Sequence, residues 1–173
     1  MYWSRTLVDT IQKVFVGAGT GQINGAAIQD GTLAPDKLLA SAAGLYNASA
    51  VNYTSATPVQ VQLPNKWVAS GGVSQGTNVL IVPDFWSWVI VTFAGYIQEA
   101  NASGTVVQLQ ENDGSGWYTR AAWKGGLPVD VNISMLLAVP PKAQFQCVIG
   151  VTQSQTMVSP IFTLGLLGQV AGP

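Results

Sequence analysis

Histidine is absent from the 173 residues of the chain, and this narrows the chemistry that it can perform. Histidine is the commonest general base near neutral pH and a common metal ligand. The segment Gly72-Val-Ser-Gln-Gly76 matches the G-x-S-x-G pattern of serine hydrolases, but that reaction needs a histidine partner and a strand–turn–helix elbow. We therefore expect a glycine-rich loop at this position and no hydrolase.

Carboxylates are the next candidates for chemistry. Glu111 and Asp113 are two residues apart beside a turn, whereas the other candidates, Asp84, Glu99 and Asp130, are scattered. A glycosidase needs two carboxylates across one cleft, and a calcium site needs several oxygen ligands, of which Glu111, Asn112 and Asp113 supply some. Asp113-Gly114 is a usual hairpin-turn pair, so we expect solvated turn residues, no catalytic residue, no metal and no cofactor.

Aromatic residues give a third possibility, which is binding. Trp117, Tyr118 and Trp123 follow a turn, where side chains that stack on sugar rings are often found. Trp86 and Trp88 are two residues apart, which places them on the same face of a strand. That spacing favours packing between subunits over ligand contact.

Composition limits the partners. Charged residues are only 9% of the chain, against about 25% in an average globular protein, and the formal net charge is −1 with no basic cluster. Nucleic-acid binding and membrane insertion are therefore not expected, because phosphate contacts need Lys and Arg and a spanning helix needs about 20 apolar residues. The single cysteine, Cys147, is predicted to be a small core residue.

The segment from Asp84 to Ile97 is the strongest predicted strand. It is rich in β-branched and aromatic residues, and it is apolar on both faces: Phe85, Val89, Val91 and Phe93 on one face, and Trp86, Trp88, Ile90 and Tyr96 on the other. A strand of this kind is covered on both sides. In a small all-β domain the second cover is another subunit.

Roughly eight short strands are predicted from Val51 onward. Apolar residues alternate with glutamine around Gln60 and Gln108, and turns separate the strands. The pattern indicates a mainly β, antiparallel jelly-roll sandwich over residues 51–173. The final strand, at Pro160 to Leu167, is also two-faced, so we expect it to neighbour the strand at 85–97 and the single-faced strands to form the outer sheet.

Residues 1–50 are predicted to be an attachment or oligomerisation arm. An amphipathic helix is expected over residues 4–15, with Leu7, Ile11 and either Val14 or Phe15 on its apolar stripe. A glycine-rich connection follows, and a second short helix is expected from Pro35 to Ala43. A helix as short as the first needs a partner surface to be stable.

The strand order resembles the trimeric jelly roll of the tumour-necrosis-factor and complement globular-head type. In that family a proline opens the long inner strand, a hairpin ending in Asn follows, and a Phe/Gly/Leu strand closes the fold. The matching segments are Val82-Pro83-Asp84 with Val89-Ile-Val-Thr-Phe93, Thr105-Val-Val-Gln-Leu-Gln-Glu-Asn112, Ile133-Ser-Met-Leu-Leu137 and Phe162-Thr-Leu-Gly-Leu-Leu167. Pro140-Pro141-Lys142 departs from the Gly-Asp turn that the family often shows.

Residues 21–33 and Asp36-Lys-Leu38 resemble segments of bacteriophage fibre and spike proteins. Together the two resemblances imply a non-enzymatic virion protein, such as a head fibre, a capsid decoration or a tail-tip component. It would be synthesised in the host cytoplasm, since no secretory signal is visible, and assemble as a homotrimer. Leu7, Ile11 and Phe15 would attach it to other capsid or tail proteins.

The expected trimer interface contains two-faced-strand residues, namely Trp86, Trp88, Ile90, Phe162, Leu164 and Leu166. The alternative is a carbohydrate- or receptor-binding module. In that case Trp117, Tyr118 and Trp123 would contact a host surface glycan.

Overall fold

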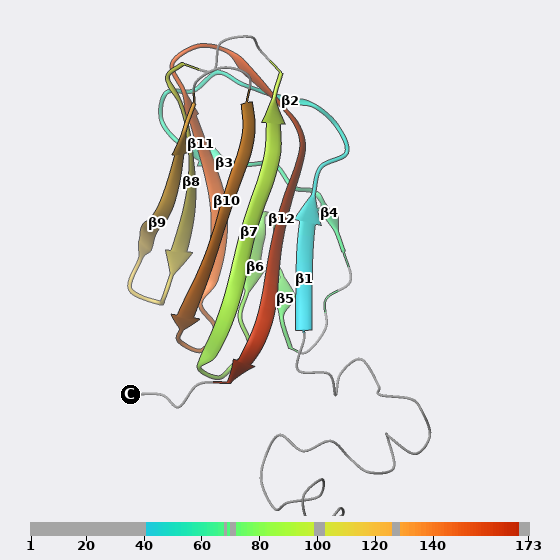
Figure 1. The fold of residues 1–173 in the computed structure, drawn as a ribbon, viewed down its shortest axis with the longest axis vertical. Helices are drawn as coiled ribbons and strands as arrows, with labels where there is room; N and C mark the ends of the chain where they lie inside the picture. The colour runs from blue at the N-terminus through green and yellow to red at the C-terminus, as the bar shows by residue number, and fades with distance from the viewer. Residues whose placement is uncertain (1–40, 68, 70–71, 99–102, 126–128, 170–173) are drawn as a thin grey trace, which may run out of the picture. The chain divides into compact units, whose positions relative to one another are not determined.

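The computed structural model describes residues 41–67, 69, 72–98, 103–125 and 129–169. Twelve strands in this part of the chain form two antiparallel sheets that pack face to face (Figure 1). The described residues contain no helix with the length and apolar character needed to cross a membrane.

Each sheet has six strands. The first sheet has the order β10 (Val129–Val139), β7 (Ser87–Ile97), β12 (Gln155–Gln169), β1 (Ser41–Tyr46) and β4 (Asn65–Lys66), and β2 (Val51–Tyr53) also pairs with β12. The second sheet has the order β5 (Ser74–Gln75), β6 (Val79–Ile81), β11 (Gln144–Val151), β8 (Thr105–Asn112) and β9 (Trp117–Lys124), and β3 (Val59–Gln60) pairs with β11. The prediction of a mainly β, antiparallel sandwich is confirmed.

The two-faced strands are neighbours, as predicted, because β7 pairs with β12. The prediction for β10 was wrong: this strand pairs with β7 in the same sheet instead of joining the outer sheet. Asn132 and Ser134 suggested a strand with one polar face. Further along that face the polar residues give way to Leu136, which is 58% exposed, so β10 is two-faced at its end.

The predicted helix at residues 4–15 lies outside the described residues. The end of the second predicted helix is wrong, because Ser41 to Ala43 belong to β1, which pairs with β12 along all six of its residues. Pairing with a strand that is distant in sequence overrides a local helix signal. Because β1 precedes residue 51, residues 41–46 are part of the sandwich and not of a separate arm.

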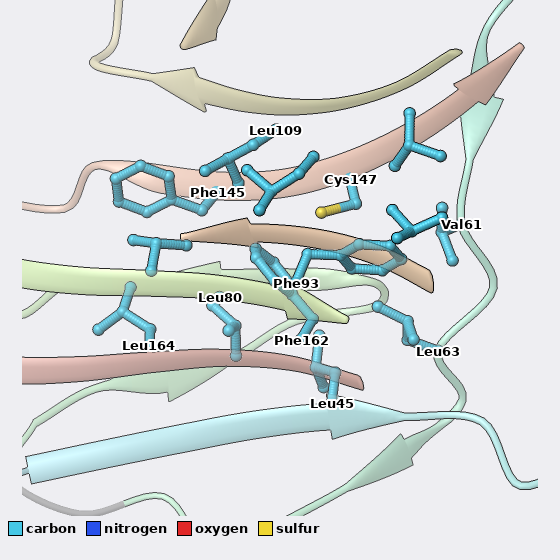
Figure 2. Close-up of a cluster of buried hydrophobic side chains, with 14 of the residues drawn as sticks. Leu45, Val61, Leu63, Leu80, Phe93, Leu109, Phe145, Cys147, Phe162 and Leu164 are labelled. Atoms are coloured by element: carbon cyan, nitrogen blue, oxygen red, sulfur yellow. The ribbon is translucent and has the colours of Figure 1, made fainter. Parts of the chain in front are cut away.

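The core lies between the two sheets (Figure 2). Alternate residues point inward, so β7 contributes Phe93, β12 contributes Phe162, and β11 contributes Phe145 and Cys147. The rings of Phe93 and Phe162 meet edge to face, with centroids 6.4 Å apart. The prediction that Cys147 is a small core residue is confirmed, and burial raises the pKa of its thiol well above the ordinary value.

Candidate functional site

The outer face of the first sheet is unusually apolar for a surface that meets water. Large hydrophobic side chains lie exposed on β7, β10 and β12: Trp88 (44% exposed), Ile90 (40%), Tyr96 (41%), Leu136 (58%) and Leu167 (56%). We refer to these five residues as the apolar face. Contiguous exposed hydrophobic residues of this kind mark interaction surfaces.

Strand register brings the apolar face together. Leu136 lies opposite Ile90, and Ile90 lies opposite Gly165 on the next strand. A side chain at position 165 would crowd Ile90, since a Cβ there would lie 3.0 Å from its Cγ2 atom. Leu167 is the extra residue of a β-bulge beside Trp88, which gives this end of the face one more apolar side chain.

Polar groups interrupt this face, and one end of β10 is polar because Asn132 and Ser134 follow Asp130 on the outward side. Thr92, Ser134 and Thr163 are in register across three strands, and the Oγ1 atom of Thr92 lies 3.2 Å from the Oγ atom of Ser134. Asp130, opposite Tyr96 at one end, is the one charged residue among the described strand positions on this face. The hydroxyl band and the polar end of β10 therefore separate Tyr96 from the rest of the apolar face.

An aromatic pair extends the same side of the sheet across β1. Trp67 packs over Gly44, where a Cβ would come within 2.5 Å of the Trp67 ring, so only glycine fits. Its ring centroid lies 6.1 Å from that of Tyr46. The backbone N–H of Trp67 donates to the Gly44 carbonyl at 2.8 Å, which holds the tryptophan in place although it is 49% exposed.

The free edge of this sheet is protected only by the polar residues at one end of β10, Asp130, Asn132 and Ser134. The edge strand β10 has eleven residues and contains no Lys, Arg or Pro. Edge strands normally carry such residues, because a long apolar edge with unpaired backbone groups recruits other chains. An exposed apolar face and an edge strand with little charge therefore lie on one sheet.

Glu111 and Asp113 do not form a catalytic pair. Glu111 is 1% exposed and its Oε2 atom lies 2.7 Å from Nε of Arg120, so it is held in a buried ion pair. Asp113 lies in the exposed β8–β9 hairpin, where hydrogen bonds from the Ser115 hydroxyl and backbone N–H lower the pKa of the carboxyl. Glu111 is therefore buried and Asp113 is exposed to water, so the two carboxylates do not share one cleft although they are two residues apart.

The G-x-S-x-G segment is not a nucleophile elbow. Ser74 lies in β5, which is followed by strand β6 and not by a helix. In the described part of the chain, no group of three or more His, Cys, Asp or Glu residues is arranged to hold a metal ion.

The structure separates the residues predicted to form the trimer interface. Trp88 and Ile90 lie on the apolar face, and Trp86 is half-buried just before β7. Phe162, Leu164 and Leu166 point into the sandwich core and are at most 4% exposed, so their side chains are unavailable to a partner. These three were assigned to the wrong face of a two-faced strand. Leu7, Ile11 and Phe15 lie outside the described residues.

Sequence analysis missed Leu136, Leu167 and Trp67. For Leu136 a signal existed, because the alternation of polar residues in β10 stops after Ser134. Leu167 is exposed through a bulge, and Trp67 reaches the face through a two-residue strand. Neither feature has a sequence pattern that would have identified it.

The predicted ligand-contact residues do not form one surface. Trp117, Tyr118 and Trp123 all lie on the edge strand β9. Trp117 is opposite Asn112 on the outer face, whereas Tyr118 and Trp123 are opposite the buried residues Glu111 and Val107. Trp123 packs against the core. Of the three, Trp117 alone is an exposed aromatic residue on the outer face of the second sheet.

Solved structures share this fold. Murine APRIL matches with a TM-score of 0.57 and 8% identity over 74% of this chain and 99% of that chain. Eiger TNF from S. frugiperda matches with a TM-score of 0.55 and 11% identity, covering 78% and 96%. The globular domain of zebrafish complement 1qA protein matches with a TM-score of 0.51 and 9% identity, covering 75% and 99%.

No family model matches the sequence. No curated protein matches it either. The structural matches show that the chain has the jelly-roll fold of tumour necrosis factors and complement globular domains.

Proposed function

We propose that the chain is a non-enzymatic structural protein that assembles as a homotrimer through the apolar face of its first sheet. The observation that carries this proposal is the cluster of Trp88, Ile90, Leu136 and Leu167, each 40–58% exposed in the single chain. Burying the remaining half of each side chain stabilises an assembly by roughly 1 kcal/mol per residue. Large apolar interfaces are typical of obligate oligomers.

A cyclic arrangement would cover both the apolar face and the edge strand β10 of each subunit. If the edge strand β10 of one subunit covers the apolar face of the next, the contact joins two different surfaces. Contacts between different surfaces form a closed ring when the rotation between neighbouring subunits closes, and an open filament when it does not. A ring of three is the arrangement that the resemblance to the tumour-necrosis-factor and complement heads implies.

The virion is the proposed setting. Its support is the likeness of residues 21–33 to phage fibre segments, with the chain before the sandwich serving as the attachment arm. A fragment of residues 39–173 tests this part. The full chain would co-sediment with capsid or tail particles prepared without it, and the fragment would not.

Light scattering on the full chain tests the assembly. A mass about three times the 18.1 kDa chain is expected, and the Trp88→Asp variant would be monomeric because a carboxylate cannot be buried unpaired in an apolar interface. Trp117→Asp is the matched control, since that tryptophan is also 40% exposed but belongs to the other sheet. The proposal would be wrong if the Trp88→Asp variant were still a trimer or if the parent protein were a monomer.

A further inference from the structure

The outer face of the second sheet carries a ladder of amide side chains. Gln60 donates through Nε2 to Oε1 of Gln146, and Gln146 donates to Gln110 at 2.8 Å. Gln110 donates to Oε1 of Gln108 at 3.1 Å, and the Thr119 hydroxyl donates to the same oxygen at 3.3 Å. These five side chains, from β3, β11, β8 and β9, are the amide ladder.

The ladder presents polar groups in fixed positions. A glutamine amide has two N–H groups, and each donating glutamine uses one of them within the ladder. Gln146 is almost buried, at 6% exposed, whereas Gln108 and Gln110 are half-buried and Gln60 is exposed. Because hydrogen bonds within the ladder already orient these amides, a ligand would bind them with a smaller loss of side-chain conformational entropy.

Trp117 stands next to the ladder on the same face. It lies opposite Asn112, so Gln110 is its diagonal neighbour across the strand pair, about 7–8 Å away. The tryptophan is 40% exposed and follows the β8–β9 hairpin. An exposed indole ring beside fixed amides offers a stacking surface and directional hydrogen bonds together.

The charge of this face narrows the class of ligand. None of the ladder residues, Trp117 or Asn112 is charged, and Lys124 at the far end of β9 is separated from Trp117 by the length of the strand. Arg120, next to Thr119, is 41% exposed, but its guanidinium group is paired with Glu111 beneath the sheet. Among the described residues an anionic ligand would therefore find no unpaired cation beside the stacking ring, and an apolar ligand would leave the amides unpaired. The chemistry that matches is a neutral molecule with many hydroxyl groups and an apolar ring face.

We propose that Trp117 and the amide ladder bind an uncharged oligosaccharide. The apolar face of a sugar ring stacks on Trp117, and the hydroxyl groups of the next sugar reach Gln110, Thr119 and Gln108. The strand spacing of about 4.8 Å places successive amides at intervals comparable to the size of a sugar ring. This site does not depend on the proposed assembly, because it belongs to the other sheet.

Isothermal titration of the full chain with uncharged hexasaccharides of glucose, mannose, galactose and N-acetylglucosamine tests the site. Binding of at least one probe is expected, with affinity at least tenfold weaker in Trp117→Ala and in Gln110→Leu. Tyr118→Ala is the matched control: it is 45% exposed on the same strand but on the opposite side, and it would keep the parent affinity. Light scattering on each variant reports folding and assembly separately from binding.

Several results would overturn the inference. They are no binding of any uncharged probe by the folded parent protein, affinity unchanged by Trp117→Ala, and equal losses in Trp117→Ala and Tyr118→Ala. Binding only to acidic oligosaccharides would overturn it too, because the described residues place no unpaired cation beside Trp117.

Discussion

The two outer faces of the sandwich obey the same alternation and carry opposite chemistry. On the first sheet the outward residues include Trp88, Ile90 and Leu136, whereas on the second they include Gln108 and Gln110. Both sheets turn an apolar face to the shared core. The core therefore does not explain the difference. The difference lies in the side chains that each outer face presents, which are exposed hydrophobic residues on the first sheet and hydrogen-bonded glutamines on the second.

The largest expected effect comes from placing a charge on each face in turn. Leu136→Asp is expected to weaken trimer association about a thousandfold, or roughly 4 kcal/mol, because an unpaired carboxylate would be buried. Thr119→Asp, on the amide ladder, is the partner variant and is expected to leave association unchanged. Sedimentation equilibrium measures both. If Leu136→Asp and Thr119→Asp weakened trimer association equally, the first sheet would not be the specific assembly surface.

The second prediction concerns the one buried charge among the described core residues, which lies beneath the second sheet. Arg120→Ala leaves Glu111 without its partner and is expected to lower the free energy of unfolding by about 2 kcal/mol. Arg120 is 41% exposed, so water replaces part of the lost interaction. Urea denaturation of the variant measures the loss.

Glu111→Leu combined with Arg120→Ala removes both charges and is the control. It is expected to recover most of the stability, because an apolar residue replaces a buried charge that needed pairing. A double variant as unstable as Arg120→Ala would mean that the carboxylate is not the source of the loss.

The amide ladder provides a smaller effect. Gln146→Leu removes the bonds from Gln60 and to Gln110 and is expected to lower the free energy of unfolding by about 1 kcal/mol, while the trimer mass stays unchanged. Gln62→Leu is the matched control, since this exposed glutamine is outside the ladder. Substitutions on the apolar face are expected to change the mass of the assembly in solution, whereas substitutions on the ladder are expected to change the free energy of unfolding. Loss of the trimer in Gln146→Leu would contradict that division.

The smallest effect depends on pH. The hydrogen bonds from Ser115 lower the pKa of Asp113 below its ordinary value of 3.8. A lowered folded-state pKa means that the carboxylate stabilises the fold above pH 3.8 and loses this contribution as the pH falls through the folded-state value. The stability difference between the parent and Asp113→Asn is expected to be constant above about pH 5 and to shrink on acidification. Urea titrations across this range measure it, and a difference that grows in acid would contradict the assignment.

Much of the fold was predictable because alternation is local. The period of two identified the strand at 85–97, placed Trp88 and Ile90 on the face opposite Val89 and Val91, and indicated that the final strand would be its neighbour. The absence of histidine and the low charge also pointed away from catalysis and towards a covered surface. The class of sandwich followed from strand number and turn spacing.

The candidate site was only half predictable. In a two-faced strand, composition does not say which face turns inward, so Phe162, Leu164 and Leu166 were placed on the interface although they form the core. Trp117, Tyr118 and Trp123 looked like one cluster in sequence, but the strand directs the first away from the other two. Deciding between faces requires knowing what lies across the sheet.

The sequence by itself determined the β class of the chain, the pairing of its two apolar strands and the low charge of its surfaces, because period and composition are properties of consecutive residues. Tertiary structure alone decided that β1 joins the sandwich, that β10 brings Leu136 beside Ile90, and that glutamines from three strands form one ladder. The physical reason is strand register. Backbone hydrogen bonds between segments far apart in the chain select which side chains become neighbours, and no local pattern encodes that choice.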